Sequence, residues 1–240
     1  MKSPFRSHIL PLFAVLSGLL GLLLRIWLFL MTDEKGLLPA DHFAGSALFV
    51  LSAIAIAVIF LATRDLTPRQ LHRHTIRRYN IPAYLAGGFG FILNAVFVLL
   101  KSPVRLALVA TAGSLLGGII MFCIAYLYKA NRRFSYLLPA AITVAFMLDA
   151  VAQCQVWGSL PQIQEYFFPL MASIFLVLTA YERTLFSARK PRPKRLAFYS
   201  QSAVFFCTVS LHSSQWILYL GMLFWAAAQI YPCTATKKKV

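Results

Sequence analysis

Two ionisable side chains, Arg25 and Asp149, stand inside long apolar runs. Charges within a membrane are costly and usually functional. An arginine there can hold an anionic group, and a carboxylate can orient the arginine or bind a cation. At about 1.5 Å per residue the two lie about 24 Å and about 18 Å along their helices. The sequence therefore permits two alternatives, an ion pair that fixes helix register or a shared ligand site.

Three further polar residues are candidates for the same site: Asn94, Gln153 and His212. Gln153 shares a helical face with Asp149, four residues earlier. Asn94 lies about 18 Å from the start of its own run. A polar stripe along the seventh apolar run consists of Gln201, Thr208 and His212. We predict that these residues join Arg25 and Asp149 in a ligand-binding pocket that opens outward.

Small residues predict how the helices pack. Arg25 shares a face with Ser17, Gly18 and Gly21. Small residues let helix backbones approach closely in lipid, so this face, with its charge, should point into the bundle. The third run has glycines at 87, 88 and 90, and the fourth has the Gly113-x-x-x-Gly117 pattern followed by Gly118. Because the intervening loop is short, we expect the third and fourth helices to form a tight antiparallel hairpin.

The segment 32–42, between the first two apolar runs, carries Asp41 and His42. This adjacent pair has the chemistry of an acid–base or metal-binding group. The alternative is a solvated turn in which Asp41 caps the next helix. Together with Arg25, its Asp-Glu-Lys-Gly-Leu-Leu-Pro sequence resembles a region of uncharacterised bacterial multi-pass membrane proteins, over about residues 22–65. That resemblance implies a bacterial inner membrane and brings no activity with it.

Composition indicates the class of protein. Of the 240 residues, 60% are hydrophobic and 12% are charged, yet the net charge is +16. Soluble domains are about 45–50% apolar and about 25% charged. Disordered basic tails are poor in apolar residues, and soluble nucleic-acid binders have ordinary composition with exposed charge. The chain is therefore predicted to be a single multi-span membrane domain over 1–240, without a soluble domain or a nucleic-acid partner.

The predicted fold class is all-α: a polytopic membrane bundle of eight transmembrane helices. A helix needs about 20 mostly apolar residues to cross the hydrocarbon core. The expected spans are about 9–31, 43–62, 82–100, 104–128, 137–157, 166–186, 198–212 and 215–231. Residues 198–231 would make one helix about 50 Å long, too long for a single span. The polar segment 210–215 is therefore predicted to turn the chain into a hairpin.

Basic residues predict the orientation. They gather at the N-terminus, in 63–81, 129–133 and 183–196, and at the C-terminus. With eight spans these segments lie on one side, which the positive-inside rule makes the cytoplasm, with both termini there. They hold 19 of the 23 Lys and Arg residues, Arg183 included. We expect them to contact anionic headgroups, and we interpret 63–81 as a basic surface segment because its apolar spacing fits a helix face poorly.

Enzyme signatures are missing from the sequence. There is no H-E-x-x-H, G-x-S-x-G, Walker A or dinucleotide-type glycine motif, and the four cysteines form no C-x-x-C pair. We therefore predict no catalytic residue, metal or cofactor. The leading hypothesis is a small transporter-like or ligand-binding component for a small anionic ligand or lipid. One alternative is an enzyme acting on a lipid or isoprenoid through Asp149, His212 or Asp41 and His42. The other is a scaffold or partner subunit of a membrane complex; the oligomeric state stays open.

Overall fold

The structure is a computed structural model, and it is entirely helical over the residues that it describes. These are 6–31, 43–64, 73–101, 105–130, 135–157, 163–188, 190 and 192–230. The side chains of 6–8, 73–79, 101, 105–110, 155–157 and 163–165 are not described.

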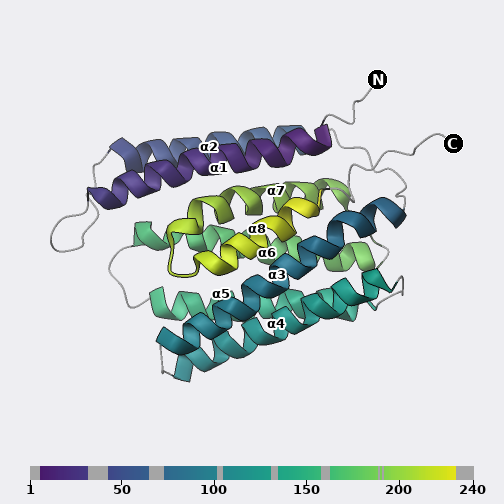
Figure 1. The fold of residues 1–240 in the computed structure, drawn as a ribbon. Helices are drawn as coiled ribbons and strands as arrows, with labels where there is room; N and C mark the ends of the chain where they lie inside the picture. The colour runs from purple at the N-terminus through teal and green to yellow at the C-terminus, as the bar shows by residue number, and fades with distance from the viewer. Residues whose placement is uncertain are drawn as a thin grey trace.

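Eight α-helices and one short 3₁₀ turn make up this part of the chain. They are α1 (Arg6–Leu30), α2 (Phe43–Arg64), α3 (Arg73–Lys101), α4 (Arg105–Lys129), α5 (Leu137–Trp157), α6 (Ile163–Ser187), α7 (Pro193–Val209), η1 (Ser210–His212) and α8 (Trp216–Ala228). Successive helices run in opposite directions, so the start of α1 and the end of α8 lie at the same end of the bundle (Figure 1). The turn between α7 and α8 falls where the sequence places it.

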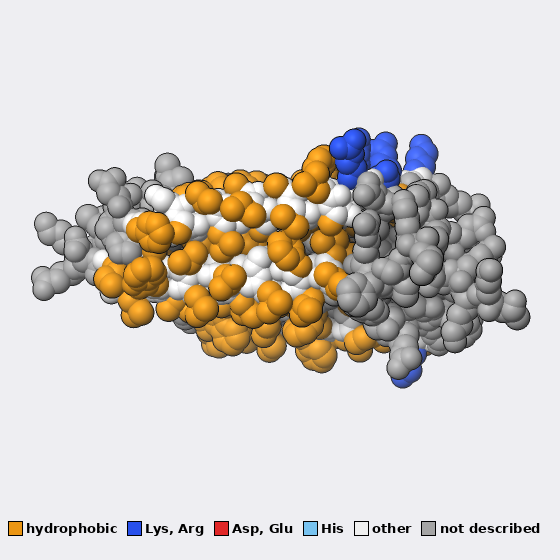
Figure 2. Space-filling model, turned by 90° about the horizontal axis from the view of Figure 1, so that it is seen from above, with side chains coloured by type: hydrophobic (Ala, Val, Ile, Leu, Met, Phe, Trp, Pro, Cys, Tyr) orange, Lys and Arg blue, Asp and Glu red, His pale blue; other side chains and the backbone are white. Residues whose placement is uncertain are grey.

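Six of these helices, α1 to α6, are long and apolar enough to cross a membrane, and α8 is a shorter apolar helix. Much of the apolar surface faces outward; Leu23, Phe43 and Leu100 are examples of exposed large side chains. Figure 2 shows this apolar surface running along the molecule, with basic side chains gathered at one end. A polar solvent would penalise such a surface, whereas lipid chains match it. The fold is therefore a membrane-type helix bundle.

Close helix contacts form at the small residues that the sequence singles out. A Cβ on Gly18 would lie 2.6 Å from Thr208 Cβ, and a Cβ on Gly21 would lie 2.8 Å from Val209 Cγ2. A Cβ on Gly118 would lie 3.1 Å from the carbonyl oxygen of Gly88. The predicted packing of α1 through its small-residue face and the α3–α4 hairpin are thus confirmed. The sequence did not predict the equally close α3–α8 interface, where Gly221 packs against Gly90.

Two helices begin before the spans predicted for them. The third span is expected to start at Pro82, but α3 already begins at Arg73 and contains Pro82 in its interior. Proline removes one backbone donor, and a helix tolerates that loss where neighbours or water satisfy the freed carbonyl. Residues 73–81 are therefore helical rather than part of an irregular basic segment. The seventh span is expected at 198, but α7 starts at Pro193, a favoured first helical residue.

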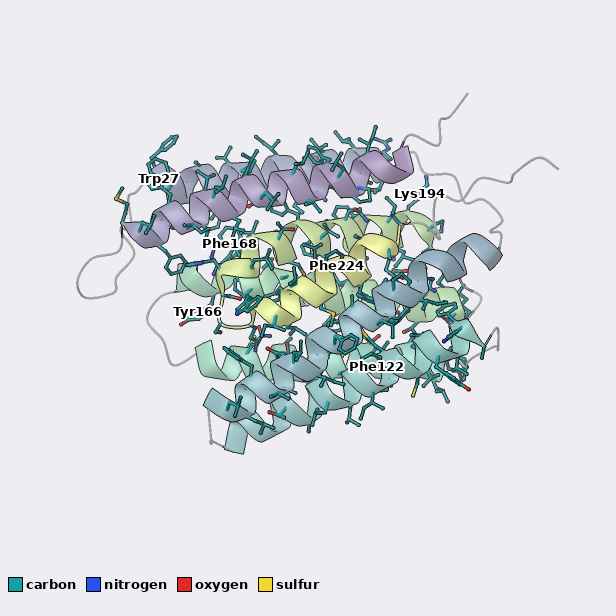
Figure 3. The ribbon with its side chains drawn as sticks, viewed as in Figure 1. Trp27, Phe122, Tyr166, Phe168, Lys194 and Phe224 are labelled. Atoms are coloured by element: carbon teal, nitrogen blue, oxygen red, sulfur yellow. The ribbon has the colours of Figure 1, made fainter. Side chains whose placement is uncertain are left out.

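The two ends of the bundle differ in side-chain chemistry. Exposed cations, among them Lys194 and Arg195, lie at the end where α7 begins. Trp27 lies at the opposite end, near the end of α1, as Figure 3 shows. Exposed basic side chains at one end fit the topology that the sequence predicts. Arg183 is the exception, because it is only 3% exposed.

Candidate functional site

Gln153 on α5 is the centre of a buried hydrogen-bonded network. Its Nε2 donates to Asp149 Oδ2 and to Gln215 Oε1, both at 2.5 Å. Its Oε1 accepts from Tyr219 Oη at 3.2 Å and from Ser173 Oγ at 3.4 Å. A glutamine amide has two donor hydrogens and two acceptor lone pairs, so all four are used. We call Asp149, Gln153, Ser173, Gln215 and Tyr219 the Gln153 cluster.

Asp149 is the acidic member of this cluster. It lies one turn before Gln153 on α5, as the i, i+4 spacing predicts. It is 2% exposed, and while Oδ2 accepts from Gln153, Oδ1 has no hydrogen-bond partner. A buried carboxylate oxygen without a partner is expensive. The site thus holds an unused acceptor in its interior.

Arg25 is buried at the end of α7. It is 3% exposed, and its Nη1 donates to the carbonyl oxygen of Val209 at 3.2 Å. Val209 is the last residue of α7, where carbonyls lack helical partners and carry partial negative charge. The guanidinium carbon also lies 5.7 Å from the ring centre of Phe29 and 5.9 Å from that of Phe168. Figure 3 shows Phe168 beneath α1. A backbone carbonyl and two aromatic rings thus stabilise Arg25.

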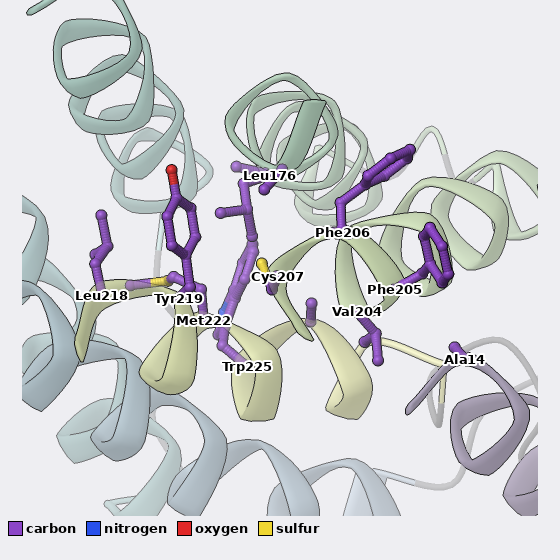
Figure 4. Close-up of a cluster of buried hydrophobic side chains, with 14 of the residues drawn as sticks. Ala14, Leu176, Val204, Phe205, Phe206, Cys207, Leu218, Tyr219, Met222 and Trp225 are labelled. Atoms are coloured by element: carbon purple, nitrogen blue, oxygen red, sulfur yellow. The ribbon is translucent and has the colours of Figure 1, made fainter. Parts of the chain in front are cut away.

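Arg25 and Asp149 contact different partners, so they form no direct ion pair in this structure. Tyr219 relates the two, because its hydroxyl interacts electrostatically with both Asp149 and Arg25. That hydroxyl also lies 3.3 Å from the carbonyl oxygen of Pro169, the residue after Phe168. In Figure 4 the Tyr219 side chain rises from α8 with its hydroxyl directed toward neighbouring helices. The two charges therefore belong to one polar region through Tyr219.

The other candidate residues lie around this region without bonding to Asp149. His212 is exposed, and its ring packs edge-on against Phe29 at 4.9 Å between centroids. Asn94 is buried on α3, and its Oδ1 has no hydrogen-bond partner. It lies one turn beyond Gly90, which packs against the backbone of Ile217 and Leu218 at the start of α8. Asn94 is thus close to α8 rather than bonded within the Gln153 cluster.

The remaining sequence candidates are structural or undescribed. The Thr208 hydroxyl donates to the Val204 carbonyl oxygen at 2.8 Å, within its own helix. Gln201 donates to the neighbouring hydroxyl of Ser200 at 3.3 Å. Neither side chain joins Arg25 or Asp149. Asp41 and His42 lie outside the described residues.

A second buried cation lies toward the opposite end of the bundle. The Nη2 of Arg183 on α6 donates to the hydroxyl of Tyr128 on α4 at 2.5 Å. The ring of Tyr128 lies 5.9 Å from that of Tyr84 on α3, which in turn lies 6.2 Å from that of Trp225 on α8. Arg183 interacts electrostatically with Tyr84 and Tyr128. We call Tyr84, Tyr128, Arg183 and Trp225 the Arg183 cluster.

This cluster is not predicted from the sequence, in which Arg183 counts among the cytoplasmic charges. One signal for burial was available. Leu185 and Phe186 follow Arg183, so the apolar helix continues past it. Burial then allows the guanidinium carbon to lie 5.4 Å from the ring centre of Phe186. Its other partners come from α3, α4 and α8, which no local pattern in α6 reveals.

An apolar layer lies between the two clusters along the helices that they share. On α8, Met222 falls between Tyr219 and Trp225, and on α6, Leu176 falls between Ser173 and Arg183. Both belong to the buried hydrophobic core, with Phe206 of α7 (Figure 4). The Gln153 cluster and the Arg183 cluster are therefore separate sites.

Among the described residues, no three His, Cys, Asp or Glu side chains converge as metal ligands would. Comparison with known protein families, with curated proteins and with solved structures finds no match. The candidate site is therefore interpreted from its own geometry.

Proposed function

We propose that this chain is a small transporter-like, ligand-binding protein of a bacterial cytoplasmic membrane, with eight spans and both termini in the cytoplasm. Its site comprises Arg25 and the Gln153 cluster, and its ligand is a small molecule with an anionic group. The six long apolar helices support the membrane assignment. The exposed cations at one end support the orientation.

The buried Asp149 carboxylate, with its unpartnered Oδ1, is the observation that carries the proposal. A residue kept only for packing would not bring a carboxylate into the apolar interior, because hydrophobic residues of similar volume pack as well or better. Ionisable residues inside membrane proteins characteristically mark substrate and ion pathways. Asp149 therefore fits a site that acts on a ligand better than it fits a structural role.

A polar route connects this carboxylate to one end of the bundle. Gln215, in the turn before α8, is half-buried and contacts Gln153, which contacts Asp149. Ser214 and His212 in the same turn are exposed. This turn lies at the end of α7 opposite to Lys194, which the proposed topology makes the outer face. A ligand or cation from outside would thus meet the turn first.

Arg25 and Asp149 would bind different parts of a ligand. Arg25 is held at the α7 end with its guanidinium against two rings, and it presents a fork of donors that matches a carboxylate or phosphate. Asp149 offers the free acceptor Oδ1, which suits a cation or an ammonium group. Tyr219 lies near enough to interact electrostatically with both. A ligand with an anionic group, accompanied by or joined to a cationic one, satisfies this arrangement.

The test compares ligand-induced stabilisation of purified wild type and Arg25→Leu. Thermal unfolding in detergent is measured with sodium acetate and with glycine, each against sodium chloride at equal ionic strength. Because a bound ligand stabilises the folded state, at least one probe should raise the wild-type Tm by about 2 °C or more. The same probe should leave the Tm of Arg25→Leu unchanged.

Two carboxylate variants provide the matched comparison. Asp149→Asn removes the carboxylate of the site. Glu182→Gln makes the same change at a buried carboxylate near the C-terminal end of α6, away from the site. The ligand response should fall in Asp149→Asn and persist in Glu182→Gln. If no probe stabilises wild type, or if both variants respond alike, the proposed pocket is rejected.

The described residues give no support to an enzymatic role. Asp149 bonds to Gln153, and His212 packs on Phe29, so these two ionisable groups are not hydrogen-bonded to each other. General acid–base chemistry needs such groups within reach of one reacting atom. We therefore assign neither residue a catalytic role in this proposal.

A further inference from the structure

Arg183 is a buried cation whose donors are mostly unused. It is 3% exposed, and only its Nη2 has a hydrogen-bond acceptor, the hydroxyl of Tyr128. Its Nε and Nη1 have none. A guanidinium carries five N–H donors and no acceptor, so most of its bonding capacity is idle here. Buried polar groups are normally satisfied, and a group that is not calls for an explanation.

The other members of the Arg183 cluster add further unpartnered groups that can donate. The Tyr84 hydroxyl and Trp225 Nε1 are buried, and neither makes a hydrogen bond of acceptable geometry, although the hydroxyl lies near enough to interact with Arg183 and with Trp225. Asn80, one turn before Tyr84 on the same face of α3, is also buried with both amide atoms unpartnered. The adjacent carboxylate, Glu182, interacts electrostatically with Arg192 and Arg195 of the next segment, and its Oε2 has no hydrogen-bond partner. Among the described residues, the Arg183 cluster itself thus has four unpartnered atoms that can donate, and its guanidinium is hydrogen-bonded to no carboxylate.

An oxyanion would correct both imbalances at once. A phosphoryl group has several terminal oxygens, which can accept from the guanidinium fork, from Tyr84 and from Trp225 together. Arg183 lies four residues before the end of α6 at Ser187, or about 6 Å along the helix axis. That depth lies just inside the end of the candidate span, on the side next to the headgroup region. The position therefore suits a phosphoryl group better than a solute bound at the bilayer midplane.

We propose that the Arg183 cluster is a binding site for a phosphoryl oxyanion, contributed by a lipid headgroup or by free phosphate. Exposed cations at the same end, including Arg192, Lys194 and Arg195, would attract such an anion. The donors are sealed from solvent in this structure, so binding requires a local opening. Tyr128, whose hydroxyl accepts from Arg183, is half-buried, so movement of its side chain would provide that opening. The site is distinct from the proposed Arg25 site.

The experiment measures thermal stabilisation of the full-length purified protein by two phosphoryl probes. One arm uses sodium phosphate against sodium chloride at equal ionic strength. The other uses dioctanoyl phosphatidylglycerol against dioctanoylglycerol, which lacks the phosphoryl group. A wild-type Tm raised by about 2 °C or more in either arm supports the site. The responding arm identifies the source as free phosphate or a lipid headgroup.

Variants locate the response. Arg183→Gln should abolish the shift. Tyr84→Phe, which keeps the ring and its packing, should reduce the shift, and it is the second variant to use if Arg183→Gln does not fold. The matched surface variant is Arg64→Gln on α2, a helix that packs against α1 and α7, and it should keep the full shift. Comparison across variants removes any general salting effect of phosphate. Arg25→Leu should also keep it, so failure of the proposed function and failure of this site are distinguishable. Absence of a shift in both wild-type arms, or an undiminished shift in Arg183→Gln, overturns the proposal.

Discussion

The Gln153 cluster and the Arg183 cluster each hold an ionisable side chain inside the apolar bundle, but they differ in how their hydrogen-bonding groups are satisfied. Around Gln153 every donor and acceptor of the central amide is used, and the one buried atom of the cluster without a hydrogen-bond partner is Asp149 Oδ1. In the Arg183 cluster the buried atoms without a hydrogen-bond partner can all donate. They are two nitrogens of the guanidinium, the Tyr84 hydroxyl and Trp225 Nε1. The first site is largely closed by its own hydrogen bonds, whereas the second has donors without acceptors.

This difference teaches that burial of a charge does not by itself say what the charge does. Arg25 and Arg183 are equally buried, yet Arg25 bonds to the carboxyl end of α7 while Arg183 bonds to one hydroxyl. Breaking a satisfied network leaves buried groups unpaired and is costly, whereas removing an unsatisfied charge relieves a cost that already exists. The two clusters should therefore respond in opposite ways to substitution.

The largest effect is expected from Gln153→Ala, which removes the centre of the first cluster. Asp149 then loses its hydrogen-bond donor, and Ser173, Gln215 and Tyr219 lose a shared partner. We expect a loss of about 3 kcal/mol in the free energy of unfolding, measured as a fall in Tm.

The matched control is Gln229→Ala on the segment after α8, whose side chain donates to the Trp225 carbonyl oxygen at 3.0 Å. It removes the same side chain without touching the Gln153 cluster, so its Tm should fall much less. Equal losses of Tm in the two variants would mean that the hydrogen bonds of Gln153 stabilise the protein no more than those of Gln229.

The next effect concerns the backbone contact that positions Arg25. In Gly21→Ala the new Cβ would lie 2.8 Å from Val209 Cγ2, so Val209, whose carbonyl oxygen accepts from Arg25, must shift. We expect a loss of about 2 kcal/mol in unfolding free energy. Gly45→Ala is the control, because a Cβ there meets nothing within 4 Å.

The outcome of that pair also tests the separation of the two clusters. Gly21→Ala should weaken any ligand response that depends on Arg25 and should leave the phosphate response of Arg183 intact. If Gly45→Ala were as destabilising as Gly21→Ala, the close packing of α1 against α7 would not be the cause.

Sequence reasoning anticipated the parts of the fold that depend on local pattern. The span over 137–157 coincides with α5, and the polar residues at 210–215 mark the turn before α8. The small residues Gly18 and Gly21 correctly indicated that Arg25 faces the bundle, because residues spaced three and four apart share one helix face. Each of these features depends on residues within one helix or one loop.

What the sequence could not indicate depends on contacts between distant helices. The acceptor for Arg25 is a backbone carbonyl, a group that every residue carries, so no residue type reveals it. Arg183 near a helix end reads like an arginine that extends toward water, as such side chains commonly do. Its burial follows from Tyr84, Tyr128 and Trp225, which lie on three other helices.

The third prediction compares the two buried arginines directly. Arg25→Met should lower the free energy of unfolding by about 1 kcal/mol, because it removes a charged hydrogen bond to Val209. Arg183→Met should leave it unchanged or raise it by about 1 kcal/mol when no phosphoryl compound is present, since an apolar chain of similar length replaces an unsatisfied charge. Urea or thermal unfolding of both variants in one detergent measures the difference, and a large loss in Arg183→Met would instead make Arg183 a structural element.

The smallest expected effect is also the sharpest test of the comparison, because it changes one oxygen atom in each cluster. Tyr219→Phe removes a hydroxyl that lies within hydrogen-bond distance of Gln153 and of the Pro169 carbonyl oxygen, so it should cost about 1 kcal/mol. Tyr84→Phe removes a buried hydroxyl that has no hydrogen-bond partner, so it should cost nothing or stabilise slightly. The two tyrosines lie on helices in contact and are fully buried, so differences in solvent exposure cannot account for unequal results. Equal losses of Tm would show that the Tyr84 hydroxyl is satisfied in the folded protein, and the donor surplus around Arg183 would then be smaller than the structure indicates.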